Sequence, residues 1–206
     1  MESGLKAIIF DLGNVLIDFD HRIASRRISK FTEKGGEEIY NLFFDSGLTG
    51  IFEEGEISPQ QFFQEVKHKL NLKLNYEGFV PIWNEIFFFS EKNLEVYNLA
   101  RSLKKHYRIA LLSNINVLHF EYVEKIFPIL DVFNNIITSF EVGARKPKKE
   151  IYQEALEILN ASPKDTFYTD DRGELIESAK ELGIQAYVFT NPEQLKKDLR
   201  RTGVKI

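Results

Sequence analysis

Four stretches of the chain place side chains capable of chemistry where apolar runs or loops end. The residues are Asp11, Ser113 with Asn114, Lys146, and Asp170 with Asp171. In an open α/β sheet the carboxyl ends of parallel strands meet at one edge, and ligands bind there. A carboxylate gathered there with a hydroxyl, an amide, a lysine and two further carboxylates could attack phosphorus as a nucleophile, provided that a cation lies between the anions.

Taken singly, each of these residues has an ordinary structural explanation. Ser113 and Asn114 can cap a helix, and Lys146 can lie on the surface. Asp170 and Asp171 can stabilise a helix N-terminus through their charge. The complete set, in this order along the chain, is what favours a catalytic site.

Five short apolar segments predict β-strands, because they are rich in Ile, Val, Leu and aromatic residues and too short for typical helices. They lie at residues 7–11, 108–113, 135–138, 166–169 and 185–189. Helical patterns accompany the last four; one ends at Gly183, and another begins with Asn191 as N-cap and Pro192 at the first helical position. This alternation predicts an α/β fold with a parallel sheet and right-handed crossovers.

The alternation stops between the first two strands, where the pattern is helical throughout. Helices are expected near residues 21–31, 37–44, 59–70 and 76–88, and Ser58-Pro59-Gln60-Gln61 is a strong helix start. Most of the phenylalanines lie in this stretch, where they would form a small core of their own. We expect residues 17–91 to be an inserted helical lid, and residues 1–16 and 92–206 to form the α/β core.

The composition indicates which binding partners and which cellular compartment to expect for this protein. The 206 residues carry a formal charge of −4, so we expect no nucleic-acid partner. No apolar run approaches the ~18 residues of a membrane span, and Asp11 interrupts the N-terminal apolar segment, so we expect neither a membrane segment nor a signal peptide. Because there is no cysteine, disulfides and thiolate metal sites are excluded, and we expect a cytoplasmic monomer or weak homodimer.

The stretches FDLGNVL, LLSN, RKP and DDR resemble, in order and spacing, the four motifs of the haloacid dehalogenase-like (HAD) hydrolase superfamily. The variant is most similar to the helical-cap subgroup that includes bacterial α-D-glucose-1-phosphate phosphatases. The resemblance implies a Rossmann-like three-layer core with a five-stranded parallel sheet in the order 5-4-1-2-3, plus a helical cap. It also implies a Mg²⁺-dependent phosphatase that acts on a small phosphorylated metabolite, and a sugar phosphate is our preferred substrate class.

The resemblance also implies a role for each residue of the set. Asp11 would be the nucleophile that forms an aspartyl-phosphate, and Lys146 would neutralise charge on it and on the phosphoryl group. The phosphoryl oxygens would be bound by Ser113, Asn114, Lys146 and the backbone amides of Leu12 and Gly13. Mg²⁺ would be bound by Asp11, Asp170, Asp171 and the carbonyl of Gly13.

Gly13 departs from the motif of most phosphatases in the superfamily, which carry a second Asp there as general acid and base. Glycine cannot move a proton, so three hypotheses follow. Another group near the lid entrance, Asp18, Asp20 or His21, replaces the Asp. Alternatively, the leaving group of the substrate needs little protonation, as in a sugar 1-phosphate, or the protein is no longer an efficient enzyme.

Two other functions stay open beside the phosphatase. A haloacid dehalogenase also uses an Asp nucleophile but needs no metal, and the retained Asp170 and Asp171 argue against it. A degenerate domain could bind a phosphorylated ligand with little turnover, which Gly13 supports, as does Leu175 at a position where the superfamily often has Asn.

Other polar residues are expected to have less direct roles. Glu53 and Glu54 are expected in a loop of the lid, where contact with substrate is a further hypothesis. The histidines His68, His106 and His119 show no metal-ligand spacing and are expected on the surface or within helices.

Overall fold

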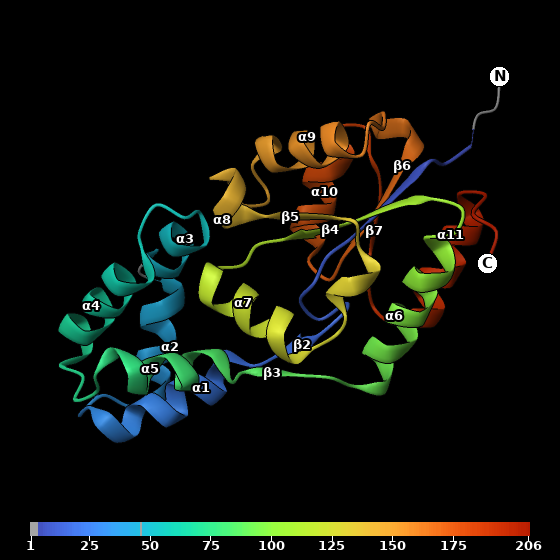
Figure 1. Cartoon of the computed structure of the whole chain (residues 1–206). Helices are drawn as coiled ribbons and strands as arrows, with labels where there is room; N and C mark the ends of the chain where they lie inside the picture. The colour runs from blue at the N-terminus through green and yellow to red at the C-terminus, as the bar shows by residue number, and fades with distance from the viewer. Residues whose placement is uncertain (1–3, 46) are drawn as a thin grey trace.

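The centre of the molecule is a five-stranded parallel sheet (Figure 1). The structure, a computed structural model, describes residues 4–45 and 47–206. The strands are β1 (Ala7–Phe10), β4 (Arg108–Ser113), β5 (Asn135–Thr138), β6 (Thr166–Asp170) and β7 (Gln185–Val188), in the order β5-β4-β1-β6-β7. When only these five strands are numbered along the chain, this is the expected order 5-4-1-2-3, read from the other edge. The parallel sheet and the α/β class are therefore confirmed.

Helices cover both faces of this sheet (Figure 1). Ile8 and Phe10 of β1 belong to one buried apolar cluster and Ala7 and Ile9 to another, as expected for side chains that alternate along a strand. The first cluster includes residues of α6 (Glu91–Leu103), α7 (Val117–Ile126) and α11 (Pro192–Arg201), and the second includes residues of α9 (Lys149–Ile158) and α10 (Gly173–Glu181). Burial on both faces explains why β1 is a continuous apolar run.

Short segments complete this part of the chain: η2 (Leu130–Val132), α8 (Ser139–Val142) and η3 (Pro163–Asp165). Helix α11 starts as predicted, since the side chain of Asn191 accepts a hydrogen bond of 2.9 Å from the backbone N–H of Gln194. Among the described residues, no helix combines the length and the apolar character needed to cross a bilayer.

Between β1 and β4 the chain forms a helical segment with its own apolar cluster. Its helices are α1 (His21–Ile28), η1 (Ser29–Phe31), α2 (Gly36–Asp45), α3 (Leu48–Glu53), α4 (Pro59–Leu70) and α5 (Tyr76–Asn84). Phe62 of α4 stacks on Phe52 of α3 at 4.4 Å between ring centroids and lies 4.9 Å from the ring of Trp83. The aromatic residues therefore join these helices, while the boundaries at residues 17–91 stay a prediction.

Two details of this segment correct the sequence analysis. The chain leaves and re-enters the core region as a short antiparallel ribbon of β2 (Asp18–Phe19) and β3 (Phe87–Phe88), so the segment is not entirely helical and α5 ends before residue 88. Helix α3 was not predicted, and Glu53 is its last residue instead of a loop residue. The pairing of β2 with β3 joins distant parts of the sequence, and α3 is too short for a clear helical period, so local patterns reveal neither.

Candidate active site

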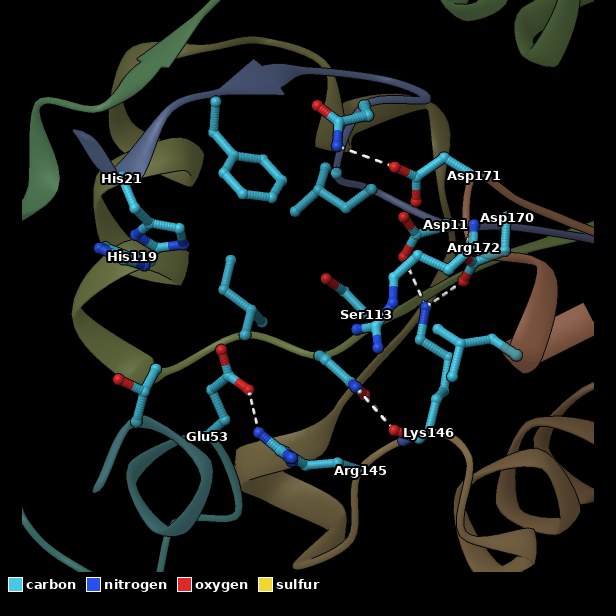
Figure 2. Close-up of a pocket in the computed structure, with 18 of the residues that line it drawn as sticks. Asp11, His21, Glu53, Ser113, His119, Arg145, Lys146, Asp170, Asp171 and Arg172 are labelled. Carbon is cyan, nitrogen blue, oxygen red and sulfur yellow. Dashed lines mark hydrogen bonds and ion pairs between the residues drawn. The ribbon is translucent and has the colours of Figure 1, made fainter. Parts of the chain in front are cut away.

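The carboxyl edge of the sheet brings the predicted residues together around one cavity of about 370 Å³ (Figure 2). Asp11 follows β1, and its backbone N–H continues the sheet by donating to Thr169 at 3.0 Å. Ser113 ends β4, and Asp170 ends β6, on the two strands that flank β1. The cavity wall includes all of the predicted phosphate and metal residues: Asp11, Leu12, Gly13, Ser113, Asn114, Lys146, Asp170 and Asp171.

Lys146 makes the central contacts of the site. Its ammonium donates to Asp11 Oδ1 at 2.6 Å, to Asp170 Oδ2 at 2.7 Å and to the carbonyl of Leu112 at 3.0 Å. Burial alone would favour the neutral amine, but the charges of Asp11 and Asp170 outweigh it and raise the pKa of Lys146 above its ordinary value. Lys146 is therefore a fixed positive charge beside Asp11.

The side chain of Asn114 positions the backbone that carries this lysine. The N–H of Lys146 donates to Asn114 Oδ1 at 2.8 Å, and Asn114 Nδ2 donates to the carbonyl of Lys146 at 2.9 Å. Both ends of the amide are thus in use. A contact between Asn114 and a phosphoryl oxygen, as the sequence analysis expected, would therefore come from its backbone N–H.

The carboxylate of Asp170 is fully engaged in the protein. Its Oδ2 accepts from Lys146 and from the buried hydroxyl of Tyr168, and its Oδ1 accepts from the N–H of Arg172 at 3.0 Å. Burial raises the pKa of Asp170, but these contacts, with Lys146 the strongest, outweigh burial and hold the pKa below its usual range. Asp170 consequently remains charged and orients Lys146.

Asp171 is held by Asn14, a residue of the turn that follows Asp11. Asn14 has a left-handed backbone conformation (φ 57°), and its Nδ2 donates to Asp171 Oδ2 at 2.8 Å. The turn that ends β1 therefore also fixes the second carboxylate of the pair.

The three carboxylates of this site form a set that a hard divalent cation fits. Ligand oxygens of Asp11, Asp170 and Asp171 lie within 4.8 Å of one another. Burial, only partly offset by Lys146, raises the pKa of Asp11 to about 7, and the charges of Asp170 and Asp171 add to the rise. Within the part of the chain that the structure describes, Asp11 Oδ2 and Asp171 Oδ1 make no hydrogen bond, so each keeps an oxygen for a metal.

Gly13 is a position that no side chain fits without rearrangement. A Cβ atom there would lie 2.6 Å from Cε1 of Phe19, closer than any van der Waals contact allows. The ring of Phe19 therefore fills the space where the resemblance places an acid–base carboxylate.

Only one of the three predicted substitutes for that carboxylate lines the cavity. Asp18 accepts from Lys92 at 2.6 Å, and Asp20 caps α1 by accepting from the N–H of Arg22 at 2.8 Å. His21 lines the cavity, and Figure 2 shows it across from Asp11. Burial lowers the pKa of His21 to about 4, so its imidazole is neutral at pH 7.

His119 lies buried in the same wall, 5.8 Å from the ring of His21. Its Nδ1 accepts from Asn116 Nδ2 at 3.0 Å, and its Nε2 donates to the carbonyl of Trp83 at 3.1 Å, which fixes one neutral tautomer. Burial, assisted by His21, lowers the pKa of His119 to about 3. The expectation that His119 lies in a helix is correct, but it is not on the surface, whereas His68 and His106 are exposed.

Several residues of the cavity wall were missed as site residues. They include Phe19, Thr49, Ile115, His119 and Arg145. Arg145 precedes Lys146 directly, which was a usable signal. The others reach the cavity through contacts between distant segments, for which the sequence gives no local sign.

The comparisons with known proteins identify the class to which this fold and site belong. A family model for the haloacid dehalogenase-like hydrolases matches residues 5–183. The chain therefore belongs to the haloacid dehalogenase-like hydrolase family, which confirms the resemblance.

Relatives of known activity match over nearly the whole chain. A D-ribitol-5-phosphate phosphatase of Bacteroides thetaiotaomicron is 26% identical, with 95% of this chain and 97% of the relative covered. A sesquiterpene phosphatase of Aspergillus oryzae is 24% identical, with 98% of each chain covered. A crystal structure of a HAD family enzyme of B. thetaiotaomicron in complex with magnesium and inorganic phosphate has a TM-score of 0.79 at 29% identity, covering 91% of this chain and 95% of that chain.

The buried neutral His119 predicts a pH-dependent stability. Its pKa is about 3 in the folded chain and 6.5 as the ordinary value, so between these values the unfolded chain binds more protons. Stability is full above about pH 6.5 and is lost as the pH falls; from pH 7 to pH 5 this histidine accounts for a loss of about 2 kcal/mol.

His119→Gln should reduce this loss by about 1–2 kcal/mol, measured by urea unfolding at pH 7 and pH 5. His106→Gln, at an exposed position, is the control and should leave the pH dependence as in the wild type. An unchanged pH dependence in His119→Gln would contradict the lowered pKa of His119 in the folded chain.

Proposed function

We propose that this chain is a Mg²⁺-dependent phosphatase that hydrolyses a small phosphorylated metabolite, a sugar or sugar-alcohol phosphate, through an aspartyl-phosphate on Asp11. The observation that carries the proposal is the placement of Asp11 in the cavity wall between Lys146 and Asp171. Support comes from the D-ribitol-5-phosphate phosphatase and from the similar enzyme crystallised with magnesium and phosphate.

The contacts of Asp11 suit a nucleophile. Oδ2 is the oxygen left for the metal, so Oδ1, whose charge Lys146 neutralises, would attack phosphorus in line. The new O–P bond forms as the ester P–O bond breaks, and the leaving oxygen takes a proton. Water then attacks the phosphorus of the aspartyl-phosphate, which releases inorganic phosphate and restores the carboxylate of Asp11.

The other residues would bind and neutralise the phosphoryl group. The buried hydroxyl of Ser113 and the amides of Leu12 and Gly13 would donate to its oxygens, and Lys146 supplies a fixed positive charge. Mg²⁺, when held by Asp11, Asp171 and the Gly13 carbonyl with Asp170 beside it, supplies the charge neutralisation that lets a carboxylate approach a phosphate dianion.

We also propose that His21 accepts the proton of the attacking water. It is the predicted acid–base residue that lines the cavity, and its imidazole is neutral at pH 7, the protonation state that a base needs. The acidic imidazolium form of His21 is absent at pH 7, so the leaving group would receive its proton from another source.

Asp11→Asn should lower phosphatase turnover by at least ~10³-fold, because an amide does not form the phospho-enzyme. The measurement is release of inorganic phosphate, together with mass mapping of acid-quenched, phosphate-labelled enzyme. Asp165→Asn, at the opposite end of the sheet in η3, is the matched control. A covalent phosphate on a residue other than Asp11 would refute this mechanism.

Asp171→Asn should raise the Mg²⁺ concentration for half-maximal activity by ~10-fold or more, since a carboxylate ligand is lost. Calorimetry of Mg²⁺ binding should show the same change without any substrate. Activity that persists in excess chelator would instead favour the metal-independent dehalogenase. Tight Mg²⁺ binding with no turnover of any phosphate ester would favour the degenerate binding domain.

His21→Gln should slow steady-state turnover by about 10²–10⁴-fold and make the phospho-enzyme accumulate, because hydrolysis of the intermediate loses its base. The same rapid-quench measurement on Asp18→Asn and Asp20→Asn decides among the three predicted residues. Full activity of His21→Gln would remove His21 from the mechanism.

A further inference from the structure

Helix α3 approaches the core so closely that its last turn becomes a wall of the cavity. A Cβ atom at Gly55, just after the helix, would lie 2.5 Å from the carbonyl oxygen of Phe140, and one at Gly50 would lie 3.0 Å from Nη1 of Arg145. Gly55 therefore lets the two backbones approach each other, and Gly50 leaves room for the guanidinium of Arg145. As a result, Glu53 at the end of α3 faces the loop that carries Arg145.

Glu53 and Arg145 form an ion pair in this wall. Arg145 Nη1 donates to Glu53 Oε2 at 2.8 Å, and both residues line the cavity. Figure 2 shows the pair on the far side of the cavity from Asp171 and Asp11. A substrate whose phosphoryl group lies at Asp11 would therefore direct the rest of the molecule toward this pair.

The pair is suited to hydroxyl groups more than to a second charge. Its two charges compensate each other, so neither an anionic nor a cationic tail gains a net attraction. Glu53 Oε1 makes no hydrogen bond within residues 4–45 and 47–206, and its side chain is only 17% exposed, so an acceptor is available there. The remaining N–H groups of Arg145 are donors, and a hydroxyl can bind to both kinds of group.

We propose that Glu53 and Arg145 are specificity-determining residues that select phosphate esters with a neutral, polyhydroxylated tail. The inference rests on the proposed phosphatase function. A tail without hydroxyls displaces water from the partly buried carboxylate and guanidinium without replacing its hydrogen bonds, so such a substrate is discriminated against.

The alternative is that the Glu53–Arg145 pair only stabilises the packing of α3 against the core and does not contact substrate. A second ion pair already joins the same elements, since Lys148 binds Glu54 at 2.6 Å. Glu54 is not among the residues of the cavity wall. Glu54 also lies 4.0 Å from Nε of Arg145, so the control for Glu53→Gln is Lys148→Gln, which removes the Lys148–Glu54 pair at the same junction and leaves Glu53 and Arg145 unchanged.

The test measures kcat/KM with Mg²⁺ for three esters of equal length: a five-carbon sugar-alcohol phosphate, n-pentyl phosphate, and the sugar-acid phosphate with a terminal carboxylate. The wild-type chain should prefer the sugar-alcohol phosphate at least ~10-fold over both analogues. Glu53→Gln should reduce the preference for the sugar-alcohol phosphate over n-pentyl phosphate at least ~10-fold. In Glu53→Gln, kcat/KM for the sugar-acid phosphate relative to the sugar-alcohol phosphate should rise at least ~10-fold over the wild-type ratio, because Arg145 has lost its nearest compensating charge.

The outcomes separate the inference from the proposed function. Equal kcat/KM values of the wild-type chain for the three esters would overturn the inference. This comparison uses the wild-type chain alone, so it does not depend on whether a variant folds. Unchanged ratios in Glu53→Gln, or the same change in Lys148→Gln, also overturn it. No hydrolysis of any of the three esters by the wild type would overturn the proposed function and this inference with it.

Discussion

The charge of Lys146 is the interaction on which the rest of the site depends. An ammonium buried away from water is tolerated only when it is paired and hydrogen-bonded, and here Asp11, Asp170 and the Leu112 carbonyl satisfy it. Three neighbouring strands supply these partners, since β4, β1 and β6 lie side by side. Loss of either carboxylate would leave a buried charge uncompensated. The sheet order and the local chemistry therefore constrain each other.

The same cluster is not electrically balanced on its own. One lysine faces three carboxylates, and the pKa of Asp11 rises to about 7 because the residue is buried and because the charges of Asp170 and Asp171 add to the effect of burial. A divalent cation adds the positive charge that the chain lacks, and a phosphate dianion can then approach a carboxylate. The imbalance is thus itself an argument for a metal-dependent reaction, independent of any relative.

Most of the fold and the carboxyl-edge residues could be predicted from the sequence, because strand ends are local features and parallel strands bring their ends to one edge. Asp11, Ser113 and Asp170 follow from that rule alone. What could not be predicted depends on contacts between distant segments. The ring of Phe19 against Gly13 and the burial of His119 are examples, since neither leaves a mark in the local pattern.

Arg145 and Lys146 are adjacent in the chain, yet their side chains bind at different parts of the cavity. Lys146 is tied to Asp11 at the reacting end, and Arg145 is tied to Glu53 of α3 at the other. Asn114 holds the backbone of Lys146 through two hydrogen bonds, so the loop that carries both cations has little freedom. The part of a substrate that binds the Glu53–Arg145 pair therefore contacts a cavity wall whose position relative to Asp11 is already fixed. Such preorganisation lets contacts remote from phosphorus contribute to orientation of the reacting group.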